Sequence, residues 1–155
     1  MTAPLTNLRT DKLTWLSRAL SLIGLGISCY LAFTYLRGQS PVCSTSNGCE
    51  IVANSAYARP GGFPLPLFGV AGYLGLFVTA CMRGESARQA GMILTVIAVG
   101  ASGVLTYLEL NVIHAICYWC VSSAICASLH VAVNSARYVR GEPNIAPSEP
   151  EPVTA

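Results

Sequence analysis

Four apolar stretches, each close to the length of a helix that spans a bilayer, constrain this sequence more than any other feature. They cover residues 13–36, 66–82, 91–110 and 116–138. A helix needs roughly twenty mostly apolar residues to cross the hydrocarbon core. No water is available there to satisfy backbone polar groups, so a single apolar span adopts a helix. The sequence therefore predicts an all-α membrane protein, a bundle of four transmembrane helices.

The composition argues against a soluble domain of the same length. Charged residues make up 10% of the 155 residues, whereas hydrophobic residues make up 53%. A soluble domain of this size needs a charged surface, which so few ionisable residues cannot form. The formal net charge is only +2, and no basic cluster suggests a nucleic-acid partner. The composition therefore predicts a protein that is surrounded by membrane lipid.

The basic residues predict how the four spans are oriented, because short cytoplasmic loops are enriched in Lys and Arg. One side of the membrane would carry Arg9, Lys12, Arg18, Arg83, Arg88, Arg137 and Arg140. The other side would carry only Arg37 and Arg59. We therefore expect a multi-pass protein of the cell inner (plasma) membrane with both termini cytoplasmic. The loop over 37–65 and the turn over 111–115 would then face outward.

Three parts follow along the chain. Residues 1–12 are expected to form a cytoplasmic N-terminal segment, and residues 13–138 the four-helix domain. Residues 139–155 are rich in proline and acidic side chains, with no apolar face to bury, which predicts a disordered cytoplasmic tail. The first apolar stretch is long and lacks an A-x-A site after it, so we expect a retained span rather than a signal peptide.

The seven cysteines are divided between the spans and the outer side. Those expected on the outer side are Cys43, Cys49, Cys117 and Cys120. Those expected within the spans are Cys29, Cys81 and Cys126. Disulfides persist on the oxidising side of the membrane, whereas buried free cysteines usually serve as small apolar packing groups. This segregation directs attention to the four outer thiols.

Cys117 and Cys120 form a C-x-x-C motif at the head of the fourth apolar stretch. Cysteines at i and i+3 share one helix face and can form a disulfide. In the first turn of a helix, the free N–H groups favour the thiolate, which is the reactive form. Tyr118 and Trp119, between them, suit the headgroup boundary. The motif predicts a redox pair within reach of a lipid-soluble oxidant.

Cys43 and Cys49 flank the turn-forming segment STSNG in the outer loop. An exposed, mobile pair could present a disulfide to a soluble protein and also exchange with the C-x-x-C pair. The following CEIVANSAYA predicts a short helix on the membrane surface, before prolines and glycines that interrupt the chain. Together the two pairs predict a two-step electron relay.

Two non-enzymatic alternatives use the same cysteines. Both pairs could be structural disulfides that clamp the outer side of a four-helix membrane scaffold. Alternatively, four thiolates could hold a structural zinc ion, although the outer pair has C-x5-C spacing instead of the usual C-x2-4-C. A scaffold predicts that these cysteines keep one state, whereas a relay predicts that a quinone reoxidises the reduced protein.

The order of these motifs resembles the vitamin K epoxide reductase family in its bacterial form. The resemblance covers about residues 15–138. It rests on the spaced cysteine pair, Ser55 six residues later, the Phe68-Gly69 step at the second span and the final C-x-x-C. The other bacterial family of quinone-linked disulfide oxidases carries C-x-x-C in its first outer loop, so the order here argues against that family.

The resemblance implies a four-helix bundle around a quinone of the ubiquinone or menaquinone type, capped by the outer loop. Cys117 and Cys120 would be the active-site pair, with Cys120 beside the quinone ring. Cys43 would meet a soluble periplasmic thioredoxin-fold partner, and Cys49 would pass electrons to Cys117. The residues expected at the quinone are Ser55, Leu65, Leu67 and Phe68. The implied activity is a quinone-linked thiol–disulfide oxidoreductase that supports disulfide bond formation.

Two positions depart from the animal members of that family. Those members have a tyrosine four residues after C-x-x-C, where this chain has Ala124, and an asparagine three residues before the FG step, where it has Leu65. Both are polar contacts to vitamin K in the animal members. The resemblance therefore implies the quinone-linked reaction and leaves epoxide reduction as an open alternative.

Quinone reduction also consumes protons, and two ionisable residues fall near the outer surface, Glu109 and His114. Ionisable residues at membrane depth are functional candidates. At the boundary, however, a charged side chain is more often solvated among headgroups. We therefore expect both residues to lie in the headgroup layer without a special role.

Overall fold

The computed structural model describes residues 3–43, 47–82 and 84–140. Its helices are α1 (Ala3–Leu36), α2 (Gly48–Ala53), α3 (Pro66–Cys81), α4 (Glu85–Leu108) and α5 (Tyr118–Arg140). Shorter helical turns are η1 (Ala56–Ala58), η2 (Pro60–Gly62) and the π-helical η3 (Glu109–Ile113). All regular structure within the described residues is helical, which confirms the all-α prediction.

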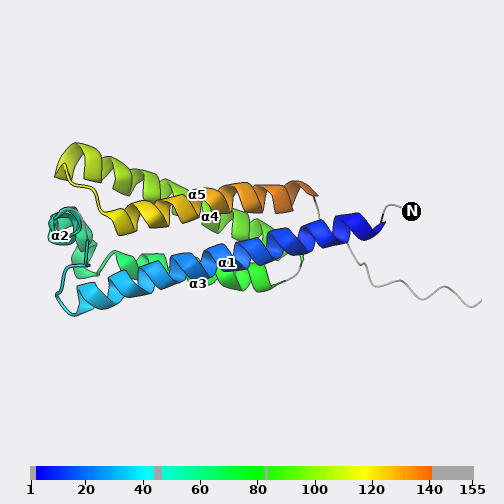
Figure 1. Cartoon of the computed structure of the whole chain (residues 1–155), viewed down its shortest axis with the longest axis horizontal. Helices are drawn as coiled ribbons and strands as arrows, with labels where there is room; N and C mark the ends of the chain where they lie inside the picture. Colours follow the sequence, from blue (N-terminus) through cyan, green and yellow to red (C-terminus); the bar gives the residue numbers. More distant parts are fainter. Residues whose placement is uncertain (1–2, 44–46, 83, 141–155) are drawn as a thin grey trace, which may run out of the picture.

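The four long helices form a closed bundle. α1 packs against α3 and α5, and α4 packs against the same two helices. α2 lies at one end of the bundle, and the start of α1 and the end of α5 lie at the opposite end (Figure 1). The short helix expected in the outer loop is thus present and sits over one end of the bundle.

Three helices of the described chain are long and apolar enough to cross a membrane. They are Lys12–Leu36, Glu85–Ile113 and Tyr118–Val139. The helix expected as the second span, α3, is apolar but has only 16 residues. At 1.5 Å per residue it extends about 24 Å, against about 30 Å for a hydrocarbon core. A bundle of four helices is therefore present, and by length three of them qualify as spans.

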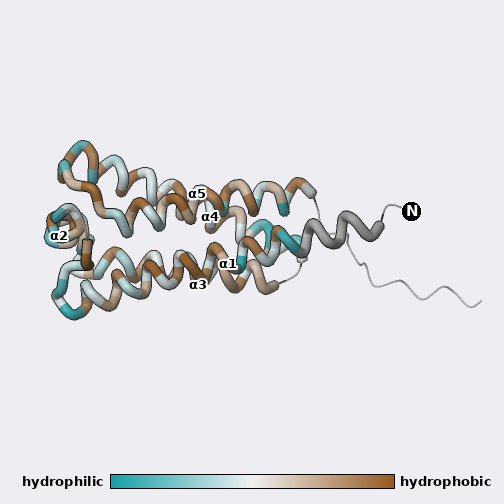
Figure 2. The backbone as a smooth tube through the Cα atoms, in the orientation of Figure 1, coloured by the Kyte–Doolittle hydropathy of each residue, from teal (hydrophilic) through white to brown (hydrophobic). Residues whose placement is uncertain are grey.

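The outward surface of the bundle is apolar, as lipid contact requires. Ile93 and Val104 on α4 are 61% and 60% exposed. Figure 2 shows hydrophobic residues along the long helices and hydrophilic residues where α1 leads into the outer loop. In water such an exposed apolar surface would drive association. Membrane lipid is the medium in which this surface is stable.

Several helix ends differ from the apolar stretches that predicted them. α1 already begins at Ala3, α4 begins at Glu85, and α5 begins at Tyr118 and ends at Arg140. At the end of the bundle opposite α2 the helices are longer than predicted, because polar residues can continue a helix beyond an apolar stretch. Residues 3–12, expected as a separate segment, therefore belong to α1. The expected tail begins at residue 139, and its residues from 141 onward lie outside the described part of the chain.

A buried polar network joins three helices near the end of the bundle opposite α2. Ser21 Oγ lies 3.3 Å from His130 Nε2, and Asn134 Nδ2 donates to Thr95 Oγ1 at 2.7 Å. Ser17, Ser21, Thr95 and His130 are at most 1% exposed. Interhelical hydrogen bonds of this kind fix helix contacts in membranes, where apolar burial gives no preference for one neighbour over another.

Candidate redox site

The outer-loop cysteines are bonded to each other. Cys43 and Cys49 form a disulfide with their Cα atoms 6.0 Å apart. Cys49 lies in the first turn of α2. The expected pair is therefore formed, but Cys49 is only 1% exposed, so this half of the pair is not the exposed group that the sequence predicted.

The two cysteine pairs meet at the end of the bundle. Cys49, Val52, Ala115 and Cys117 form one buried cluster, against which Cys43 and Cys120 pack. Gly48 allows this approach, because its α-carbon faces the Ile116 carbonyl with no room for a Cβ atom. The outer loop thus brings its disulfide onto the segment that leads into α5.

Cys117 lies immediately before α5, whereas the sequence placed it within the first turn. The Val121 N–H donates to the Cys117 carbonyl at 3.0 Å, and the Cys120 N–H donates to Cys117 Sγ at 3.4 Å. The sulfur therefore caps the helix N-terminus in the way an N-cap oxygen does. Cys120, three residues on, remains in the first turn as predicted.

The surroundings of Cys117 favour its thiolate. A side-chain hydrogen bond from Cys120 is the largest cause lowering the pKa of Cys117, and backbone N–H groups of Cys120 and Trp119 add to it. Burial and the nearby Glu109 carboxylate act in the opposite direction without outweighing these donors. The lowered pKa agrees with the expectation for a thiol at a helix N-terminus.

Trp119 holds the chain beside Cys43. Its Nε1–H donates to the Val42 carbonyl at 3.0 Å, and the Val42 N–H donates to Tyr30 Oη at 3.2 Å. The Trp119 and Tyr30 rings pack with centroids 4.8 Å apart. The residue before Cys43 is thus fixed to both α5 and α1, while Tyr118 is exposed.

Glu109 lies in a different environment from the one that the sequence predicted. It is 4% exposed, and its Oε2 accepts a hydrogen bond from the Cys117 N–H at 3.1 Å. One carboxylate oxygen and the sulfur atoms of Cys117 and Cys120 all lie within 4.8 Å of one another. The other candidate, His114, is exposed. The headgroup placement is therefore wrong for Glu109.

The backbone after α4 explains how Glu109 reaches the thiols. The π-helical turn Glu109–Ile113 ends at His114, which adopts a left-handed conformation with φ 55°. The Ala115 N–H then donates back to the Glu109 carbonyl at 3.1 Å. The chain thus reverses within a few residues and brings Cys117 over the Glu109 side chain. Single π-helical turns are common at functional sites.

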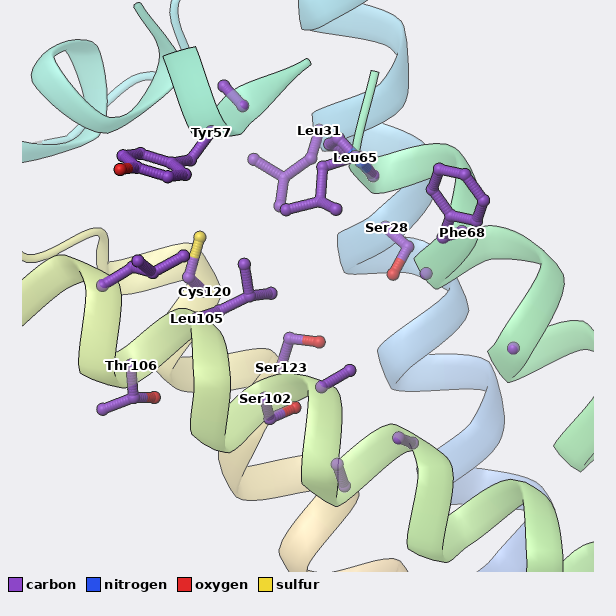
Figure 3. A pocket seen from close by; sticks show the side chains of 18 of the residues that line it. Ser28, Leu31, Tyr57, Leu65, Phe68, Ser102, Leu105, Thr106, Cys120 and Ser123 are labelled. Atoms are coloured by element: carbon purple, nitrogen blue, oxygen red, sulfur yellow. The ribbon is translucent and has the colours of Figure 1, made fainter. Parts of the chain in front are cut away.

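A cavity of about 350 Å³ lies between the long helices beneath the outer loop. Cys120 lines it, and Cys117 is not among the described residues that do so. Figure 3 shows Cys120 projecting toward the space that Tyr57, Leu31 and Leu65 border. The two thiols of C-x-x-C therefore face different neighbours: Cys117 the outer disulfide, and Cys120 the cavity.

Three of the four residues expected at the quinone line this cavity, namely Ser55, Leu65 and Phe68. Leu67 is absent from its described lining and is 36% exposed. Neighbouring helix residues project about 100° apart, so Phe68 and Leu67 cannot face the same side. Ser55 Oγ donates to the Val52 carbonyl at 2.7 Å, which leaves its oxygen lone pairs as acceptors.

Polar groups that the sequence did not single out also line the cavity. They are Ser28, Tyr35, Tyr57, Tyr73, Ser102, Thr106 and Ser123. Tyr73 Oη donates to the Ser123 carbonyl at 2.7 Å and contacts Ser123 Oγ at 3.0 Å. The sequence does show hydroxyl side chains within its apolar stretches. It has many of them, however, and it does not give the rotation of each helix, so those that face the cavity could not be selected.

The zinc alternative needs four free thiolates together. Because Cys43 and Cys49 are bonded to each other, the groups that converge are instead two thiols and the Glu109 carboxylate. Cys117 and Cys120 are free. A four-thiolate site is therefore not assembled, and the scaffold alternative gives no reason for a cavity next to Cys120.

The sequence of the chain matches a known family over most of its length. A model described as the Vitamin K epoxide reductase family matches residues 15–135. The match runs from α1 into α5 and includes both cysteine pairs, Ser55 and the Phe68-Gly69 step. It confirms the resemblance that the order of the motifs indicated.

Proposed function

The chain belongs to the vitamin K epoxide reductase family, and on that premise we propose that it relays electrons from a soluble periplasmic thioredoxin-fold protein to a membrane quinone. The observation that carries the proposal is a continuous line of thiols. Cys49 packs against Cys117, and Cys120, the other cysteine of C-x-x-C, lines the cavity. The net reaction would supply oxidised partner protein and so support disulfide bond formation.

Electrons enter at Cys43. Cys43 is half-buried, whereas Cys49 is 1% exposed, so a partner thiolate reaches the Cys43 sulfur more easily. Attack there forms a mixed disulfide and releases Cys49 as the leaving thiolate. A second partner thiol then resolves the mixed disulfide, which leaves the partner oxidised and the outer pair reduced.

The second exchange passes the electron pair inward. The Cys49 thiolate attacks Cys117 of the oxidised inner pair and releases Cys120, and Cys43 then closes the outer disulfide again. The state in the structure, with the outer pair bonded and Cys117 and Cys120 free, is the one that follows this exchange. In that state the inner pair holds the two electrons beside the cavity.

The cavity has the character that a quinone substrate of the ubiquinone or menaquinone type requires. It is lined mostly by apolar side chains, and its volume lies within the range of small-molecule sites. Leu65 and Phe68 would contact the ring, and Ser55 and Ser123 are placed for its oxygens. When bound, the quinone supplies a two-electron acceptor, and the protein supplies position and exclusion of water.

The proposed topology puts both termini in the cytoplasm of a cell whose inner membrane holds the protein. It is supported by the basic residues near the end of the bundle opposite α2, among them Lys12, Arg88 and Arg137. The outer loop and both cysteine pairs then face the periplasm, the compartment where disulfides persist.

The proposal is tested by mixing the purified protein with a reduced periplasmic thioredoxin-fold protein and a short-chain ubiquinone. We expect loss of the quinone absorbance, with one quinone reduced for each partner dithiol oxidised. Partner that has been oxidised beforehand is the control. Dithiothreitol in place of the partner separates a wrong partner from a wrong reaction. If neither reductant drives quinone reduction and the four outer cysteines keep one state, the protein is a scaffold.

A further inference from the structure

We propose that Glu109 is a catalytic residue of this site that takes the proton of the Cys120 thiol and delivers it to an oxygen of the quinone. This inference rests on the proposed function and adds the proton path that electron transfer alone does not provide. Three observations carry it: the position of the carboxylate, its burial without a cation, and its place on the wall of the cavity.

The position of Glu109 suits transfer between a thiol and a cavity. Its carboxylate and the two sulfur atoms lie within 4.8 Å of one another, and Glu109 itself lines the cavity together with Cys120. The Cys117 N–H occupies Oε2. This backbone hydrogen bond holds the carboxyl group beside the sulfur atoms. A small rotation of the carboxyl group can therefore turn its other oxygen toward the Cys120 thiol or toward the cavity.

Burial of this carboxylate is not explained by packing. Within the described residues, the groups that interact with it are the two thiols and Tyr35, none of which is a cation. Removing an ionised carboxylate from water is costly without a paired charge. An apolar side chain would fill the same space at lower cost, so a chemical role accounts for the glutamate better than a structural one.

Within the described part of the chain, Glu109 is also the only cavity-lining residue with a carboxylate or basic side chain. Among the described residues that line it, no other is Asp, Glu, Lys, Arg or His. The remaining titratable groups there are the Cys120 thiol and the phenols of Tyr35, Tyr57 and Tyr73. A phenol is a poor base near neutral pH. Proton transfer from the thiol therefore has one suitable acceptor on this wall.

The step balances as follows. The Cys117 thiolate and the Cys120 thiol form one S–S bond, the Cys120 S–H bond breaks, and two electrons pass to the quinone. The released proton goes to the Glu109 carboxylate and from there to a quinone oxygen. The second proton of the quinol comes from the outer aqueous phase, and Glu109 is again ionised. No further oxidant or reductant is needed.

The test compares Glu109→Gln with the wild-type protein in a single turnover. The glutamine keeps the size of the side chain and an oxygen that can accept the Cys117 N–H, but it cannot take up a proton. We expect the dithiothreitol-reduced variant to reduce a short-chain ubiquinone about 10²-fold more slowly, the lower end of the usual contribution of a positioned acid–base group. Exchange between the two cysteine pairs should stay within a few-fold of the wild-type rate.

Glu50→Gln is the matched control, because Glu50 is an exposed carboxylate on α2 and does not line the cavity. It should reduce quinone at the wild-type rate. If Glu109→Gln does not fold, the pair Glu109→Asp and Glu109→Asn repeats the comparison of acid with amide. Equal quinone rates for acid and amide would overturn the inference. Failure of the wild-type protein to reduce quinone would instead overturn the proposed function.

Discussion

Replacing Cys120 with alanine is expected to abolish quinone reduction while leaving the bundle folded. Within the described residues Cys120 is the only thiol on the wall of the cavity, and Cys117 cannot close a disulfide without it. The rate of quinone reduction by the reduced variant should fall to that of a protein-free mixture. Loss of one half-buried sulfur changes stability only modestly. The measurement is quinone absorbance after mixing with the prereduced variant.

A thiol elsewhere on the same helix supplies the control for this substitution. Cys126 lies on α5 six residues further on, is buried against Tyr73 and Leu76, and is not among the described residues lining the cavity. Cys126→Ala should therefore keep quinone reduction. Quinone turnover by Cys120→Ala at a rate near the wild-type value would show that another group donates the electrons.

The second large effect is expected at the entrance of the relay. Cys49→Ala should stop electron transfer from the thioredoxin-fold partner and accumulate a mixed disulfide between that partner and Cys43. Without Cys49 the outer disulfide cannot form, so the free Cys43 thiolate attacks the disulfide of oxidised partner and forms a mixed disulfide, with no Cys49 thiol to displace the partner. Non-reducing gel electrophoresis of cells or of the purified mixture, followed by mass spectrometry, would detect the linked species and identify the cysteine.

The reciprocal variant decides the order of entry. Cys43→Ala leaves Cys49, which is 1% exposed and packed against Cys117. It should give little mixed disulfide with the soluble partner. Efficient trapping through Cys49 in that variant, with none through Cys43 in the other, would reverse the proposed direction of the first exchange.

Much of this architecture could be predicted from local sequence. Long apolar stretches identify α1, α4 and α5, and the proline- and glycine-rich segment separates α2 from α3. The order of the cysteine pairs indicated the family, and their positions between the apolar stretches indicated that the two pairs lie at one end of the bundle. These features depend on composition and order along the chain, which a sequence states directly.

The features that were missed depend on how helices are rotated and where they turn. Leu67 was placed at the quinone with Phe68, but adjacent residues of α3 face different sides. Glu109 was placed among headgroups because its position near the end of an apolar stretch suggests solvent. The π-helical turn and the left-handed His114 fold it under the thiols instead. Hydropathy carries no information about either event.

Contact between the two cysteine pairs is the central claim, and one measurement addresses it directly. In the double variant Cys43→Ala, Cys120→Ala, only Cys49 and Cys117 remain of the four outer thiols. Because they pack in one buried cluster, mild oxidation should join them in a disulfide within a single chain, detected by mass spectrometry of the linked peptides. Two free thiols after oxidation, in a folded protein, would contradict the relay.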